Sequence, residues 1–220
     1  SHTYNKKTSF PNIDLNNANP TVLDKAEAYG QNLVLRYMEC LKLVGPGVAV
    51  ELGEVLQRTK SALSQQRHDK HSFLGFDWFT ATIFSIFKSQ KATLEFLQNF
   101  SQTSTSTCLW QARLAGSVCF PQHGTHPLYH SMMHLIEEIV SLELPAVANA
   151  IRLNGFTVSH ICTNWLRQCY WNFLDWEEII QYIALCVVFG PSMQAYYCVA
   201  VLKHLQPKIT ELAQNEKLVE

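Results

Sequence analysis

Charged residues are few in this 220-residue sequence. Only 16% of its residues are Asp, Glu, Lys or Arg, against about a quarter in an average soluble domain. The 17 basic and 18 acidic side chains leave a net charge of −1, so we expect neither nucleic acid nor an anionic membrane surface as a partner. Hydrophobic residues make up 47%, which is too many for a disordered chain and enough for a large core.

The sequence also lacks the short motifs that mark common active sites. It contains no G-x-x-x-x-G-K-[ST] or G-x-G-x-x-G loop for a nucleotide phosphate, and no G-x-S-x-G nucleophile elbow. We therefore expect no cofactor and no self-contained active site in this chain.

A disulfide framework is not indicated by the cysteines. Their number, seven, is odd, and no two of them form a C-x-x-C pair. Most lie among apolar residues, which is typical of reduced, buried thiols in an intracellular protein. The chain has no initiator Met, so we interpret it as a piece of a longer protein, with Ser1-His2 as the possible remnant of a cleaved tag.

No segment alternates apolar and polar residues as a strand does, and helical spacing recurs along most of the chain. The sequence therefore predicts an all-α fold without a sheet, with an extended arm over residues 1–20 and a single helical domain over residues 21–216. Caps such as Asp77, Ser89 and an Asp175–Glu178 capping box, together with glycine and proline breakers, divide that domain into helices. We expect them from Thr21 to Gly45, Val48 to Ala62, Trp78 to Lys88, Lys91 to Phe100, Pro127 to Leu142, Pro145 to Asn154, Thr157 or Ser159 to Trp171, Asp175 to Phe189, Ser192 to Leu205, and onward from Pro207.

One apolar stretch is long enough to span a membrane. No charged residue occurs between Ile179 and Leu202. Gly190-Pro191 interrupts the stretch, however, and a break at the middle of a bilayer would leave backbone groups unsatisfied. We interpret the stretch as two core helices joined by a sharp turn, with no membrane span.

The histidines raise the question of a metal site. His130 and His134 lie four residues apart on one helix face, Glu138 continues that face, and Cys119, His123 and His126 precede them. The H-E-x-x-H pattern of a zinc protease is absent. We expect no bound metal, and a zinc site formed by His130, His134 and Glu138 is the alternative hypothesis. The basic excess at residues 65–71 is interpreted as a solvated loop.

The C-terminal half carries a more specific pattern. Trp165 begins a W-L-R-Q-C-Y stretch, Gln181 to Ala184 follow after a hydrophobic gap, and Gly190 follows these. This order resembles the C-terminal lobe of the TBC domain, the helical domain of Rab GTPase-activating proteins, whose pattern is W-F-L-x-L-F, then R-I-W-D, then glycine. The resemblance covers residues 125–205 well and the first half of the chain loosely.

The catalytic motifs of that family are degenerate here. Its members use an arginine from I-x-x-D-x-x-R and a glutamine from Y-x-Q followed by G-M-N. No I-x-x-D-x-x-R occurs in this sequence, and its first arginine is Arg36. Tyr29-Gly30-Gln31 spells Y-x-Q, but Asn32-Leu33-Val34 replaces the usual continuation. The resemblance therefore implies no catalytic residue, with Gln31 as a weak candidate for a degenerate glutamine finger.

Within the family, the segments W-L-R-Q-C-Y-W-N-F-L-D-W and C-V-V-F-G-P look like those of a large ciliary member. This narrower resemblance implies a non-catalytic protein-interaction module of a scaffold that acts in primary cilium assembly and Hedgehog signalling. It implies a location in the cytoplasm at the primary cilium or its base. The implied partners are a cell cycle-related kinase and other ciliary proteins, with a Rab GTPase as a further candidate. The alternative is an active Rab GTPase-activating domain whose arginine finger lies outside this sequence.

Overall fold

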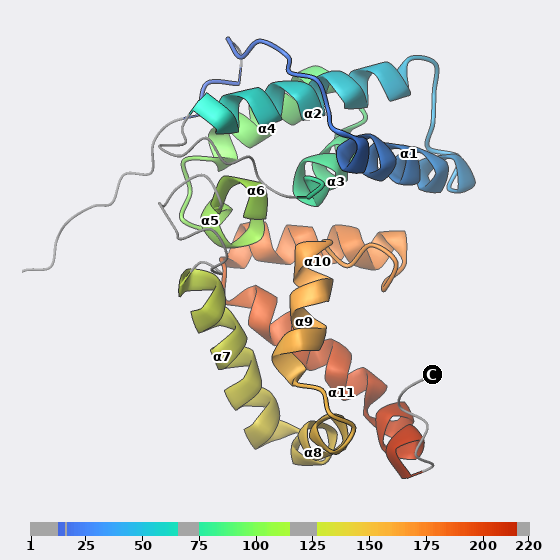
Figure 1. Cartoon of the computed structure of the whole chain (residues 1–220), viewed down its shortest axis with the longest axis vertical. Coiled ribbons are helices and arrows are strands. Elements are labelled where there is room, and N and C mark those ends of the chain that lie inside the picture. The colour runs from blue at the N-terminus through green and yellow to red at the C-terminus, as the bar shows by residue number, and fades with distance from the viewer. Residues whose placement is uncertain (1–12, 16, 66–74, 115–126, 215–220) are drawn as a thin grey trace, which may run out of the picture. The chain divides into compact units, whose positions relative to one another are not determined.

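The computed structural model describes residues 13–15, 17–65, 75–114 and 127–214. These residues form eleven α-helices and no strand (Figure 1), which confirms the predicted all-α class. By its internal contacts the chain divides into two compact units, Ser1–Pro121 and Gln122–Glu220. The recognisable lobe at 125–205 falls within the second unit, and the single domain over 21–216 stays a prediction.

The first unit is built from four longer helices and two single-turn ones. They are α1 (Lys25–Cys40), α2 (Val48–Gln65), α3 (Trp78–Phe87), α4 (Gln90–Phe100), α5 (Ser106–Leu109) and α6 (Gln111–Leu114). Helix α3 lies at the centre of this group, because Phe79, Ala81, Ile83 and Phe84 on its different faces are all buried. The loop predicted at 65–71 lies outside the described residues except for Gln65, which ends α2.

The described residues before α1, 13–15 and 17–24, contain no helix, yet some of them contribute to the core. Ile13 and Leu15 are fully buried, and Ala18 is nearly so. The backbone N–H of Leu15 donates to Gln98 Oε1 on α4 over 2.9 Å. The described residues between 13 and 18 of the predicted arm therefore act as a strap that packs into the first unit, whereas residues 1–12 and 16 lie outside the described range.

Side-chain caps fix where these helices begin. Asp24 caps α1 and forms a reciprocal capping box with Glu27. Asp77 and Ser89 cap α3 and α4, which confirms the predicted starts. Lys88 ends α3 with a left-handed backbone at φ 53°, so the turn between the two helices is only two residues long.

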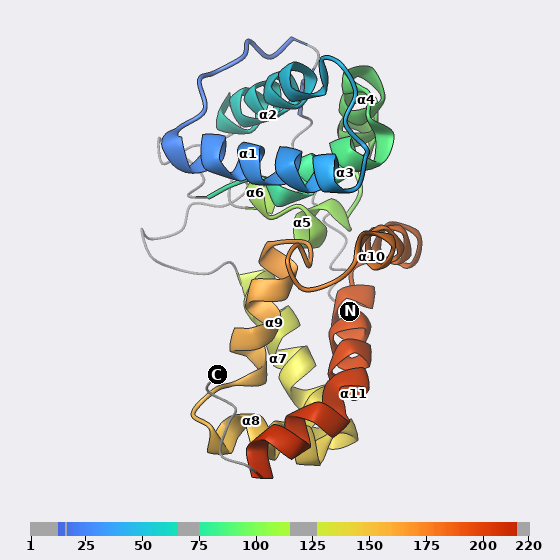
Figure 2. The ribbon, with the colours of Figure 1, turned by 90° about the vertical axis from the view of Figure 1, so that its right-hand side faces the viewer.

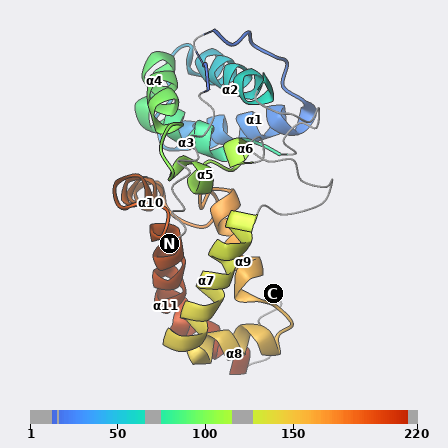
Figure 3. The same cartoon turned by 90° about the vertical axis from the view of Figure 1, so that its left-hand side faces the viewer.

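The second unit contains five helices: α7 (Pro127–Glu143), α8 (Pro145–Leu153), α9 (Val158–Arg167), α10 (Trp176–Phe189) and α11 (Met193–Gln214). Helices α7, α9 and α11 run along the unit, and α8 lies across one end of it (Figures 1, 2 and 3). Ile136, Val140, Val147, Ile151 and Val158 are buried between them.

Helix α9 is shorter than predicted. It ends at Arg167, whereas the sequence suggested that it would run through Trp171. The chain then turns tightly, with positive φ at Cys169 (48°), Tyr170 (63°) and Asn172 (69°). This turn buries the rings of Tyr170 and Trp171, and their burial supplies the free energy that offsets the unfavourable left-handed conformations.

The last two helices differ from the prediction in one respect. The Asp175–Glu178 capping box of α10 and the break at Gly190 (φ 95°) are as predicted. Helix α11, however, continues through Pro207, where the sequence suggested that one helix ends and another begins. A proline inside a helix removes one hydrogen bond and bends the helix without always ending it. No helix within the described ranges is long and apolar enough to cross a membrane.

Candidate functional site

The Tyr29-Gly30-Gln31 segment lies in the first half of α1, and its three residues have different surroundings. Tyr29 is 71% exposed, Gly30 is buried and Gln31 is half-buried. The possible role of Gln31 as a water-positioning group depends on whether its amide is available. The contacts of the segment therefore bear directly on the function.

Gln31 uses its amide to join two helices. Its Nε2 donates to the carbonyl oxygen of Ala49 at the start of α2 over 3.1 Å. The same atom lies 3.1 Å from the position that a Cβ would take on Gly53. The side chain thus lies along the first turns of α2, and it acts as a clamp between α1 and α2.

Gly30 is explained by packing. A Cβ at this position would lie 2.4 Å from Cγ of the Phe76 ring, closer than any real contact. Only glycine allows the buried Phe76 ring to lie directly on α1. Two of the three Y-x-Q residues are therefore accounted for by contacts within the first unit.

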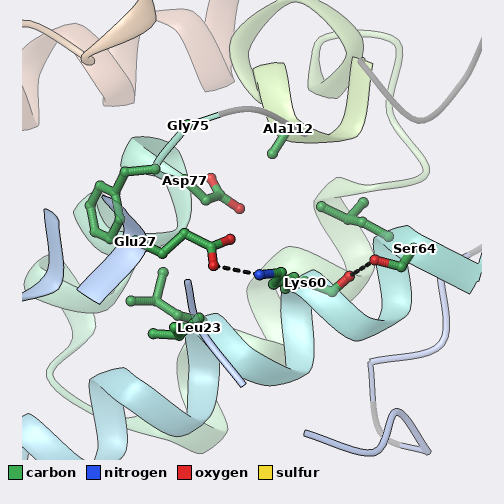
Figure 4. Close-up of a pocket in the computed structure, with 10 residues that line it drawn as sticks. Leu23, Glu27, Lys60, Ser64, Gly75, Asp77 and Ala112 are labelled. Carbon is green, nitrogen blue, oxygen red and sulfur yellow. Dashed lines mark hydrogen bonds and ion pairs between the residues drawn. The ribbon is translucent and has the colours of Figure 1, made fainter. Parts of the chain in front are cut away.

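Beside this segment the first unit has a pocket, which sequence reasoning did not find (Figure 4). The space between its walls is about 440 Å³, counted out to the open mouth. Its walls come from α1, α2, α6 and the segment that leads into α3. The lining residues are Leu23, Glu27, Leu56, Lys60, Leu63, Ser64, Gly75, Phe76, Asp77 and Ala112.

An ion pair lies at one side of the pocket. Lys60 Nζ on α2 contacts Glu27 Oε2 on α1, and it also reaches the carbonyl oxygen of Val22 at 3.4 Å. The side chains of Glu27 and Lys60 are 10% and 23% exposed. Because Glu27 Oε2 also accepts from the backbone N–H of Asp24 at 2.7 Å, the pair links the start of α1 to α2.

A second carboxylate, Asp77, points into the same pocket (Figure 4). It accepts hydrogen bonds from Trp110 Nε1 (3.0 Å), the Thr80 hydroxyl (2.8 Å) and the Thr80 backbone N–H (3.1 Å). Burial raises the pKa of this carboxyl above its usual range, the hydrogen bonds oppose the rise, and the negative charge of Glu27 adds to it. The sequence identified Asp77 only as a helix cap. It gave no sign of the pocket because Glu27 and Lys60 are 33 residues apart.

The histidines of the alternative zinc hypothesis do not assemble a site. His134 Nε2 lies 3.2 Å from Glu138 Oε1, with side chains 74% and 60% exposed. His130 is exposed on the same helix. Among the described residues no three His, Cys, Asp or Glu side chains are grouped to hold a metal, so the proposed triad is wrong. Cys119, His123 and His126 lie outside the described residues.

Most aromatic residues around Trp165 and Tyr170 in the second unit form core contacts. Trp165 is 7% exposed and Tyr170 is fully buried, and their ring centroids are 5.8 Å apart. Tyr170 also contacts the rings of Tyr182 (4.8 Å) and Tyr197 (5.4 Å). Phe173 differs from the rest, because it is 47% exposed.

Buried thiols surround this aromatic group. Cys162, Cys169, Cys186 and Cys198 are buried thiols, whereas Cys40 is exposed. Cys198 Sγ lies 3.1 Å from the Tyr170 hydroxyl. Burial raises the pKa of Cys186 to about 12, and the contact with Cys198 together with burial raises that of Cys162. Such thiols stay protonated at neutral pH and are poor nucleophiles.

The four residues aligned with R-I-W-D carry no charge, and the two in the middle are buried. Tyr182 and Ile183 are buried, whereas Gln181 and Ala184 are exposed. The Tyr182 hydroxyl accepts a hydrogen bond from Gln194 Nε2 over 3.0 Å. This part of α10 therefore serves as a core element with no ionic pair of its own.

Comparison with known proteins gives one consistent answer. The family model described as the broad-minded protein Rab TBC domain matches residues 1–219. Protein broad-minded of Mus musculus is 38% identical over 226 residues, covering 95% of this chain and 17% of that protein. Protein broad-minded of Danio rerio is 40% identical over 205 residues, covering 89% and 16%. This chain thus spans about a sixth of the length of these curated relatives. No solved structure matches it.

Proposed function

The chain belongs to the broad-minded protein Rab TBC domain family, and from this membership we propose that it is a catalytically silent TBC-like module that binds other proteins. The observation that carries the proposal is the position of Gln31. Its amide is hydrogen-bonded to α2 through Ala49 and packed over Gly53. A glutamine that positions a water on a bound GTPase needs that amide free to reach the GTPase, whereas here the amide is engaged with α2 of its own unit.

The arginine-finger motif of the family, which this sequence does not contain, supports the same conclusion. In GTPase activation an arginine finger stabilises the charge that develops on the transferring phosphoryl group, and it is worth about 10³-fold or more in rate. The sequence has no I-x-x-D-x-x-R motif. A TBC-like lobe without either finger keeps its surface for protein contacts but contributes no transition-state stabilisation.

We further propose the setting in which the module acts. On its resemblance to the ciliary member of the family, it is part of a scaffold protein of the cytoplasm at the primary cilium or its base. There it serves cilium assembly and Hedgehog signalling, with a cell cycle-related kinase among its partners and a Rab GTPase as a further candidate. Tagged full-length protein should concentrate at the base of the cilium, and deletion of this region alone should weaken cilium formation. Normal cilia after that deletion would contradict the proposal.

The lack of catalysis can be tested with a GTP-hydrolysis assay on a panel of Rab proteins. The full-length protein and this chain should both leave the intrinsic hydrolysis rate unchanged within a few-fold. Acceleration of about a hundredfold or more, a tenth of what an arginine finger gives, would refute the proposal.

Two variants distinguish the alternative, an activator whose arginine lies outside this sequence. In that case Gln31→Ala in the full-length protein would remove most of the acceleration. Gln102→Ala, which removes an amide from an exposed turn, would leave it intact. Under the silent interpretation Gln31→Ala changes only stability, by about 0.5–1.5 kcal/mol, because one hydrogen bond between α1 and α2 is lost.

A further inference from the structure

We propose that the pocket lined by Glu27, Lys60 and Asp77 binds a guanidinium group, namely an arginine side chain that a partner protein inserts from its surface. The site goes beyond the proposed function, since it assigns a specific chemistry to one contact of the module. It stands whether or not the chain accelerates GTP hydrolysis.

The first argument is the charge in the pocket. Glu27 and Asp77 bring two carboxylates, and Lys60 brings a single ammonium group. Lys60 is already paired with Glu27, and Asp77 forms no ion pair within the described part of the chain. Its hydrogen bonds come from the neutral groups of Trp110 and Thr80. When both acids are ionised, the pocket therefore lacks one positive charge, and an uncompensated charge out of water is costly.

The second argument is the shape and chemistry of the walls. Leu23, Leu56 and Leu63 supply apolar surface against which the methylene groups of a long side chain can pack. The ring of Phe76 supplies an aromatic wall, which favours a guanidinium because its plane can stack on a ring. The pocket is partly open to solvent, so the end of such a side chain can enter from outside.

These walls also argue against other cations. Calcium takes six to eight oxygen ligands and magnesium needs a nearly ideal octahedron, whereas most of the lining here is apolar. A lysine ammonium is compact and strongly hydrated, so it gains less than arginine from two carboxylates on different helices. Figure 4 shows both carboxylates directed toward the interior of the pocket, where the several donors of one guanidinium can reach them.

Trp110 provides a direct reporter, because its indole N–H donates to Asp77 Oδ2. N-acetyl-arginine amide is titrated into the ¹⁵N-labelled chain, and the Trp110 indole resonance, assigned with Trp110→Phe, is followed by NMR. We expect a saturable shift with a dissociation constant on the order of 1 mM, a value suited to a single side chain. The neutral analogue N-acetyl-citrulline amide should produce no saturable shift, and the lysine analogue a weaker affinity.

Charge variants give effects of opposite sign. Glu27→Gln makes the pocket neutral and should weaken binding about tenfold, whereas Lys60→Gln leaves two negative charges and should strengthen it about tenfold. Glu39→Gln removes an exposed acid from the same helix and should change nothing. General damage to the fold would weaken binding in both pocket variants, so the opposite signs are specific to the proposal.

Three results would each overturn the assignment. The first is the absence of a saturable shift of the Trp110 resonance in the wild-type chain. The second is an equal shift with the citrulline analogue. The third is a loss of affinity in both the Glu27 and the Lys60 variants. The first two need no variant, so the test holds even if a substitution prevents folding.

Discussion

Two buried glycines of the first unit, Gly30 and Gly53, lie inside helices, where alanine is favoured by about 1 kcal/mol. What each one faces differs. Gly30 faces the buried ring of Phe76, which would lie 2.4 Å from a Cβ, and Gly53 faces the amide end of Gln31, at 3.1 Å. A ring in a packed core cannot move aside, whereas the end of a flexible side chain can.

We therefore expect Gly30→Ala to lower the free energy of unfolding by about 1–3 kcal/mol, since overpacking outweighs the gain in helix propensity. Gly53→Ala is the matched control, and it should change stability by less than about 1 kcal/mol. Urea denaturation followed by circular dichroism measures both. Equal effects of the two substitutions would show that the Phe76 contact does not determine the residue at position 30.

At this scale the sequence predicted roles that depend on close neighbours and missed those that depend on distant ones. Asp77 was recognised as a cap because its partner Thr80 is three residues away. Its second role, facing Glu27 and Lys60, depends on three segments meeting in space. The same reason explains Gln31, whose partner Ala49 lies on the next helix.

Among the helices, the starts marked by a predicted cap were predictable, whereas α1 begins at Lys25 and not at Thr21, and the ends of α1, α2, α9 and α11 differ from the prediction. Asp77, Ser89, Thr157 and the Asp175–Glu178 box mark starts, because a capping side chain bonds to a backbone N–H two or three residues on. The end of α9 depends on the burial of Tyr170 and Trp171, a tertiary contact that compensates for left-handed backbone. Local pattern carries no information about that compensation.

Helix α11 continues through Pro207, although proline disfavours a helix at an interior position. Pro207 is exposed and lies inside α11, where its missing N–H and its ring disfavour the helix by about 3 kcal/mol relative to alanine. The helix persists because residues before the proline, such as Cys198 and Leu202, are buried in the second unit.

Pro207→Ala should therefore raise the free energy of unfolding by about 1–3 kcal/mol, less than the full propensity difference because the unfolded chain also becomes more flexible. Lys203→Ala, one turn earlier and also exposed, is the control and should stay within about 0.5 kcal/mol. Thermal unfolding compares the three proteins. A destabilised alanine variant would mean that the bend at Pro207 is needed for packing.

For the whole molecule, the recognisable sequence pattern covers a shorter part of the chain than the family model does. The TBC-like motif was evident over residues 125–205, which lie in the second unit, whereas the family model covers residues 1–219. The second unit keeps the spacing of Trp165, the R-I-W-D positions and Gly190 because these residues build its core and its turns. The first unit has Y-x-Q at Tyr29–Gln31 without the G-M-N continuation, and the sequence has no I-x-x-D-x-x-R.

Substitution of Trp165 tests whether the spacing that this chain shares with the TBC pattern follows from the core of the second unit. Its ring is 7% exposed and contacts Tyr170 and Phe173 in the same unit. We expect Trp165→Ala to cost about 3–5 kcal/mol, with faster amide hydrogen exchange across residues 127–214. Leu153→Ala, at a position 86% exposed, should cost less than about 0.5 kcal/mol. A nearly unchanged melting temperature for the Trp165 variant would remove this residue from the core.

The strap at residues 13–18 has a practical consequence for anyone who expresses this domain. A recombinant fragment trimmed to begin at α1 would look complete by its helices, yet it would lack Ile13 and Leu15, which are fully buried. Burial of each such side chain contributes roughly 1.5–3 kcal/mol to the stability of the fold. The trimmed fragment would therefore expose the apolar surface that these side chains cover, and it would tend to precipitate. Expression boundaries should therefore be set upstream of Ile13, and poor solubility of a shorter clone would say nothing about the domain itself.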